Sequence, residues 1–111
     1  MILFGQKKKN DKLSRIDVSY HQHKPKSNKL VVYNNNHIDI ESLQVTIVDN
    51  QNHQFFYEYS QIKPKESVLL SLTNLHSDKP TSFEGEISRL EFRLENTTSI
   101  FRAIETGFVR I

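Results

Sequence analysis

The chain has 111 residues, 15 of them Lys or Arg and 13 Asp or Glu, for a formal net charge of +2, and it has no cysteine. This length is typical of one domain, and the lack of cysteine excludes disulfides, thiol nucleophiles and Cys-based zinc sites. No stretch approaches the roughly 20 apolar residues of a membrane-spanning helix, and residues 1–4 are too short an apolar run for a signal peptide. As written, the sequence predicts a cytoplasmic or membrane-peripheral protein, or an extracytoplasmic one if it was trimmed from a longer precursor.

Charge is divided unevenly along the chain. Residues 1–30 hold eight basic and two acidic side chains, a net charge of +6, whereas residues 31–111 have a net charge of −4. We therefore expect residues 1–12 to form a flexible basic arm, followed by a single folded domain over residues 13–111. Such an arm can bind nucleic acid, anionic lipid or an acidic partner, and the alternative is a solvated tail. The basic candidates are Lys7, Lys8, Lys9, Lys24 and Lys26.

Alternation of apolar and polar residues predicts most of the strands. Taken in chain order, these strands cover residues 15–20, 29–33, 38–48, 54–59, 68–72 and 87–95. In the third, Leu43, Val45 and Ile47 define the buried face, and Ile38 and Ile40 extend the pattern upstream. Polar segments rich in Asn, Pro and Ser separate the strands and predict turns or loops, including a polar loop from Thr73 to Gly85.

Residues 89–95 give the clearest signal, because apolar and charged residues alternate there without interruption. A period of two places three apolar side chains on one face and four charged ones on the other. This indicates an antiparallel strand whose charged side chains form ion pairs with one another on a solvent-facing surface. The last segment, residues 100–111, is ambiguous. We expect a final strand, and the alternative is a one-turn helix capped by Ser99 and ended by Gly107.

These elements predict an all-β fold. About seven strands with turn signals every 8–12 residues are typical of an immunoglobulin-like antiparallel β-sandwich. The segment 29–72 also resembles small bacterial immunoglobulin-like modules of the FxLYD type. The resemblance is carried by Val32-Tyr33-Asn34, by Val45 to Asp49, and by Ile62 to Glu66 around Pro64, although Val45, Ile47 and Val48 replace the namesake residues. The resemblance implies a non-catalytic, often envelope-associated module and brings no functional residues with it.

Two histidines suggest a metal site. His21 and His23 share a face if the segment is extended, and this spacing can chelate zinc, copper or nickel. A third ligand would be one of His37, His53 and His76. The alternative is that they are ordinary exposed loop histidines, and we expect no cofactor.

Carboxylates form three sets that acid–base or calcium chemistry could use. Glu84 and Glu86 share a strand face, Glu91 and Glu95 share another, and a third set lies in or beside loops: Asp39, Glu41, Asp49 and Asp78. The second pair alternates with Arg89 and Arg93, which favours surface ion pairs over catalysis. No nucleophile or metal-binding motif accompanies these sets. We therefore expect a protein that is not an enzyme.

An aromatic run covers residues 55–59. Alternation directs Phe55, Tyr57 and Tyr59 to one face of the strand and Phe56 to the other. If one face is core, Phe56 becomes a candidate partner-binding side chain, because exposed aromatic rings stack on sugars or bases and anchor protein interfaces. The alternative is that both faces are covered.

The function that the sequence predicts is a non-catalytic accessory module for protein–protein interaction, in a bacterial envelope or assembly. Exposed strand edges are the expected docking route. Three alternatives stay open: a basic-arm binder of nucleic acid or anionic membrane, a carbohydrate-binding module, and a His-based metal binder. The partner and the oligomeric state are not given by the sequence.

Overall fold

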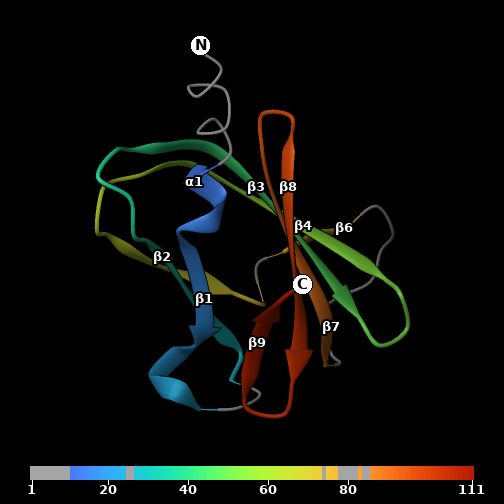
Figure 1. The fold of residues 1–111 in the computed structure, drawn as a ribbon. Helices are drawn as coiled ribbons and strands as arrows, with labels where there is room; N and C mark the ends of the chain where they lie inside the picture. The colour runs from blue at the N-terminus through green and yellow to red at the C-terminus, as the bar shows by residue number, and fades with distance from the viewer. Residues whose placement is uncertain (1–10, 25–26, 74, 78–82, 84–85) are drawn as a thin grey trace.

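The computed structural model describes residues 11–111 except 25–26, 74, 78–82 and 84–85, and its described part is an all-β sandwich of two antiparallel sheets (Figure 1). The smaller sheet has the order β1 (Ile16–Tyr20), β2 (Lys29–Asn34), β5 (Ser67–Ser71). The larger sheet has the order β6 (His76–Ser77), β4 (Gln54–Ile62), β3 (Ile40–Asp49), β7 (Ile87–Leu94), β8 (Thr97–Ile104), β9 (Gly107–Arg110). A short helix, α1 (Asp11–Ser14), precedes β1, and a 3-10 turn, η2 (His21–His23), follows it.

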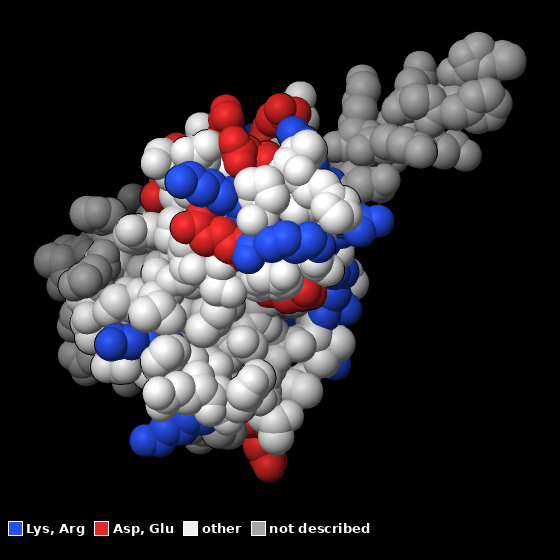
Figure 2. Space-filling view, turned by 90° about the vertical axis from the view of Figure 1, so that its left-hand side faces the viewer, with Lys and Arg blue, Asp and Glu red and all other residues white. Residues whose placement is uncertain are grey.

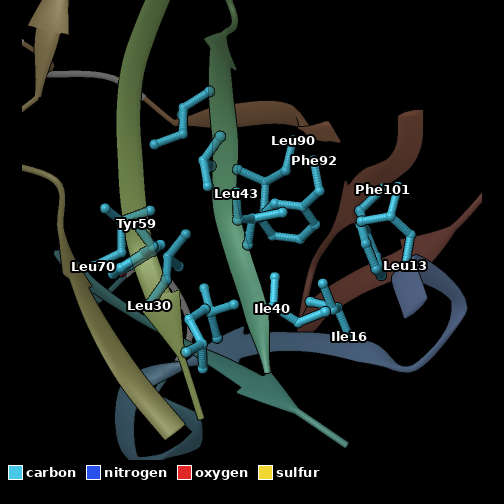
Figure 3. Packing of buried hydrophobic residues seen from close by; sticks show 14 of the residues in the cluster. Leu13, Ile16, Leu30, Ile40, Leu43, Tyr59, Leu70, Leu90, Phe92 and Phe101 are labelled. Atoms are coloured by element: carbon cyan, nitrogen blue, oxygen red, sulfur yellow. The ribbon is translucent and has the colours of Figure 1, made fainter. Parts of the chain in front are cut away.

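The hydrophobic core lies between the two sheets, as Figure 3 shows. The smaller sheet contributes fully buried side chains such as Ile16 and Leu30, and the larger sheet contributes Leu43, Leu90 and Phe92. Each is an inward position of a period-two pattern, so the alternation read from the sequence is the physical cause of the two layers. The predicted all-β sandwich is confirmed.

The strand β7 also confirms the expected division of its faces. Leu90 and Phe92 are fully buried, whereas Arg89 and Glu91 lie on the outer face. Arg89 Nε donates to Glu91 Oε2 at 2.8 Å, an ion pair along the strand. Arg89 and Glu91 therefore pair on the outer surface of the sheet, as the alternation predicted, whereas Arg93 donates to the main-chain carbonyl of Glu95.

The C-terminal segment differs from the prediction of a single strand. It forms two strands, β8 and β9, joined by a turn at Glu105 and Thr106, and β8 already begins at Thr97. The helical alternative is wrong, because Phe101 is 5% exposed while Ile104 is 42% exposed, so their helical spacing makes no common buried face. Pairing of β8 with β7 on one side and β9 on the other satisfies the main chain instead.

Two smaller predictions were wrong. Ile38 does not extend the β3 pattern: it is 51% exposed, in the loop before the strand. Burial shifts by one position at Ser42, whose φ is 57°, so that both Ile40 and Leu43 face the core. The predicted polar loop 73–85 contains the two-residue strand β6, which pairs with Phe55 and Phe56 of β4. With β6 and the divided C-terminal segment, the described residues contain nine strands rather than about seven.

One end of the sandwich, which we call the closed end, is filled by two buried asparagines. Asn34 and Asn36 are 0% and 5% exposed. Asn34 Nδ2 contacts three carbonyl oxygens, those of Ile38, Ile62 and Lys63, at 3.0, 3.0 and 3.1 Å. Its Oδ1 accepts from the main-chain and side-chain nitrogens of Asn36, and Asn36 Nδ2 also donates to a carbonyl oxygen of α1 at 3.0 Å. These bonds tie the loop before β3 and the β4–β5 turn to α1.

The two long sides of the sandwich are closed by single side chains. On one side, Tyr59 of β4 donates its hydroxyl to the Leu69 carbonyl of β5 at 2.8 Å. On the other, where β1 lies against β9 (Figure 1), Arg110 donates to the Ile16 carbonyl at 2.7 Å and to two carbonyls of α1. Its guanidinium also lies 4.5 Å from the centre of the Phe101 ring, a cation–π geometry.

Candidate functional site

The opposite end of the sandwich, which we call the open end, contains a cleft of about 510 Å³ between the two sheets. Its apolar lining comes from segments far apart in the sequence: Tyr20, Leu72, Phe83, Ile87, Ala103 and Ile104. Its polar lining consists of Ser27, Asn28, Asn50, Thr73, Glu86 and Glu105. The volume lies within the range of sites that bind small molecules or side chains of a partner.

The walls of this cleft are fixed by main-chain hydrogen bonds and ring contacts. Leu72 donates its N–H to the Asn28 carbonyl at 2.9 Å, and Asn50 donates to the Glu86 carbonyl at 3.1 Å. The ring of Tyr20 lies 4.9 Å from that of Phe108 on β9. The cleft is therefore bounded by connected elements of both sheets.

The rim of the cleft is acidic. Among the described residues that line it, Glu86 and Glu105 are acidic and exposed, and none is basic. An apolar floor beneath two carboxylates matches a segment that carries an apolar side chain followed by basic residues. The lining residues that the structure describes form no catalytic constellation of nucleophile, base and orienting acid.

Asp49 organises the β3–β4 hairpin beside the cleft. The residue is 7% exposed, and its Oδ1 accepts the main-chain N–H groups of Gln51 and His53 at 2.9 and 2.8 Å. Its Oδ2 lies 3.1 Å from Nδ1 of His53. Burial raises the pKa of this carboxyl, but the hydrogen bonds from His53 and Gln51 outweigh it and hold the pKa below its ordinary value. Asp49 is thus a hairpin cap, which accounts for a buried carboxylate without metal or catalysis.

Phe56 lies on the face of β4 opposite Phe55 and Tyr59, as the alternation predicted, and the structure shows that this is the outer face of the larger sheet, where Phe56 is half-buried. It borders a second hollow of about 510 Å³. The residues around this hollow include Gln44, Thr46, Glu58, Glu91, Arg93 and Thr98. Phe55 and Tyr59 are core residues, and Tyr57 packs against the core.

The predicted histidine pair has a different geometry from the one assumed. His21 and His23 lie in the turn η2, where Gln22 and His23 have φ values of 58° and 56°, so the segment is not extended. Within the described residues, no group of three or more His, Asp or Glu side chains is placed to hold a metal ion. His53 is instead engaged with Asp49. The side chain of His76 lies outside the described part.

The proposed calcium carboxylates are not brought together. Asp39 accepts a hydrogen bond from Gln61 at 2.9 Å near the closed end, and Glu41 is exposed at the same end of β3. Asp49 lies at the opposite end of that strand. Asp78 and Glu84 lie outside the described residues, as do the basic candidates Lys7, Lys8, Lys9 and Lys26. Lys24 is exposed directly after η2.

Strand edges were the expected docking route, and the structure places protein groups on two of them. The Ile16 carbonyl of β1 accepts from Arg110, and the Leu69 carbonyl of β5 accepts from Tyr59. Both edges belong to the smaller sheet. A partner strand that paired with them would have to compete with these bonds.

The described part of the chain has no helix whose length and hydrophobicity would let it cross a membrane. Comparisons of the chain with protein-family models, with curated proteins and with solved structures find no match. The arrangement of the described residues is therefore the basis for assigning a function.

The cleft residues were not singled out from the sequence, because each of them looked like core or loop. Tyr20 and Leu72 end inward-facing patterns, and Ala103 lies in a segment whose secondary structure was ambiguous. One signal was present: apolar patterns of several strands end in polar loops on the same side of a sandwich. Which loops gather at that end depends on the strand order, which the alternation does not give.

Proposed function

We propose that this protein is a non-catalytic binding module whose open end receives a segment of another protein. The single observation that carries the proposal is the open-end cleft, which has an apolar floor inside an acidic rim. An apolar side chain of the partner would fill the floor, and Lys or Arg residues beside it would meet Glu86 and Glu105. Buried apolar anchors surrounded by a polar rim are the usual anatomy of such interfaces.

We also infer that the sandwich is immunoglobulin-like. Supporting this inference, β2 pairs with β5, β3 with β7, and β7 with β8. These pairings correspond to the B–E, C–F and F–G neighbours of an immunoglobulin-like fold. In that family of folds the loops at the ends of the sandwich are the common binding sites, which agrees with a site at the open end.

The test begins with a displayed library of random peptides selected against the full chain. The expected enrichment is for sequences with an apolar residue next to Lys or Arg. Binding of an enriched peptide is then titrated by fluorescence polarisation. Ile104→Asp, which adds a charge at an exposed lining position, should weaken binding at least tenfold.

Val109→Asp is the matched control. Val109 is 40% exposed on the adjacent strand and does not line the cleft, so this variant should bind within about twofold of wild type. Amide chemical shifts should move at Tyr20, Leu72 and Ala103 when the peptide is added. Equal binding by both variants, or selection that yields no binding peptide, would refute the proposal.

A further inference from the structure

The two outer faces of the sandwich differ in composition. The outer face of the larger sheet carries charged side chains on three of its strands, β4, β7 and β8: Glu58, Arg89, Glu91, Arg93 and Arg102. The outer face of the smaller sheet has Val31 at its centre, with Leu69 beside it on β5 and Ser19 on β1. Leu69 is 51% exposed. Figure 2 views this side of the molecule, where an uncharged area occupies the middle and charged side chains gather toward the closed end.

An outward sheet face in water ordinarily alternates with polar and charged residues, as the larger sheet does. An exposed patch of apolar and small residues marks an interaction surface. The strands β1, β2 and β5 contain two charged residues, Asp17 and Lys29, and both are exposed on this face. We call the outward residues of these three strands the small-sheet face.

The register fixes where the two charges lie. One cross-strand row contains Asp17, Tyr33 and Ser67, and it lies toward the closed end. The next row is Ser19, Val31 and Leu69, and the third contains Lys29 and Ser71, toward the open end. Of the two charges within the three strands, the negative one and the positive one therefore lie on opposite sides of the uncharged central row; Arg15 and Lys65 are exposed just beyond the Asp17 row.

This order of charges makes the face complementary to itself. A two-fold axis that lies in the interface and crosses the strands at right angles puts the Asp17 row of one copy against the Lys29 row of the other. The central row of one copy, which contains Val31 and Leu69, then stacks on the central row of the other copy. A two-fold axis parallel to the strands would instead place Lys29 against Lys29, which is unfavourable.

From this arrangement we infer that the small-sheet face binds a second copy of the chain, as an isologous dimer with the strands of the two copies antiparallel. Three strands of five or six residues give an interface at the small end of the specific range, so the dimer should be weak. We expect a dissociation constant of roughly 10–500 μM.

Sedimentation equilibrium of the full chain, with a concentration series up to the millimolar range, measures this association. Leu69→Lys should raise the dissociation constant at least tenfold, because two copies of the new charge meet at the dyad. The matched control is Val109→Lys, an apolar side chain of similar exposure on β9, which should leave the constant within about twofold. Thermal denaturation of both variants checks that they fold.

A charge exchange tests the orientation. Asp17→Lys and Lys29→Asp should each weaken the dimer about fivefold, because each replaces two symmetric attractions by repulsions. The double variant, with the two charges exchanged, should restore the wild-type constant. A chain that stays monomeric throughout the series overturns the inference. A double variant no tighter than either single one overturns it too, as do concentration-dependent amide shifts at Gln44 and Arg93 instead of Val31 and Leu69.

Discussion

The closed end and the open end belong to the same two sheets but are finished in different ways. At the closed end, the buried side chains of Asn34 and Asn36 form hydrogen bonds with main-chain groups. At the open end, the loops stand apart around a cleft of about 510 Å³ with an apolar floor. Burial of polar groups at the closed end is unfavourable unless they are fully hydrogen-bonded. The open end instead leaves apolar surface exposed. This difference separates a part that holds the fold from the part that we propose binds a partner.

The largest effect is expected at the closed end. Asn34→Ala should lower the free energy of unfolding by about 3 kcal/mol or more, because it leaves three carbonyl oxygens and the Asn36 amide without their partner. Asn34→Asp should cost more still, since a carboxylate would face three carbonyl oxygens. Urea denaturation measures both, and Asn96→Ala at an exposed turn serves as control. A loss below about 1 kcal/mol for Asn34→Ala would contradict the view that the closed end holds the fold together.

The hairpin cap at the open end gives the next effect. Asp49→Ala should cost about 2 kcal/mol, because two part-buried main-chain N–H groups lose their acceptor. The pKa of Asp49 is lowered in the folded state, so its ionic contribution is complete above the ordinary value of 3.8 and is lost as pH falls through the lower folded value. The stability difference between wild type and Asp49→Asn, measured by denaturation from pH 7 to pH 2, should shrink below pH 3.8. Glu41→Gln, at an exposed position of the same strand, is measured beside it as the control variant.

Between the two ends, Tyr59 offers an intermediate test. Tyr59→Phe should cost about 1 kcal/mol through loss of the bond to the Leu69 carbonyl. Burial raises the pKa of Tyr59 above its ordinary value of 10.0, so its contribution is complete below pH 10.0 and is lost as pH rises beyond it. The difference in the free energy of unfolding between wild type and Tyr59→Phe should therefore become smaller when denaturation is measured above pH 10.0. Tyr57→Phe, whose ring lies 4.8 Å from that of Tyr59, is the control. An equal cost there would show that the effect is not specific to the bond between Tyr59 and the Leu69 carbonyl.

The smallest effect is expected inside the cleft. Ala103→Leu adds three carbons at a half-buried lining position with open space beside it, so stability should change by less than about 0.5 kcal/mol. The same kind of enlargement at Val32, which is 0% exposed, should cost about 1–3 kcal/mol through overpacking. Thermal denaturation compares the two. Equal costs would show that the cleft wall is as tightly constrained as the core.

The sequence was sufficient for the layers and insufficient for the ends. A strict alternation such as that of Arg89 to Glu95 has one physical solution, a strand with one buried face, and the structure has it. The division of residues 97–110 into two strands was not predictable, because Phe101 and Ile104 fit a helical spacing until pairing with β7 decides between them. Ile38 was misread because the change of phase at Ser42 is a backbone event with no side-chain signature.

The candidate sites show the same limit. Alternation placed Phe56 on the strand face opposite Phe55 and Tyr59, but only the packing of the second sheet decides that this face is the outer one. The cleft was not predicted, because its lining unites Tyr20, Leu72 and Ala103, which only the order of strands brings together. The small-sheet face was present in the sequence as strands with few charges, but its self-complementarity depends on the register between β1, β2 and β5.

Arg110 has a consequence for how the chain is made. Its guanidinium holds carbonyl oxygens of residues 13, 14 and 16, which are 94–97 positions earlier in the sequence. On a ribosome, those oxygens emerge long before the arginine that donates hydrogen bonds to them. Until Arg110 has emerged, the contact between β1 and β9 cannot form. Contacts of such long sequence separation form late and slow the search for the native state. The nascent protein should therefore resist protease only after residue 110 has left the exit tunnel.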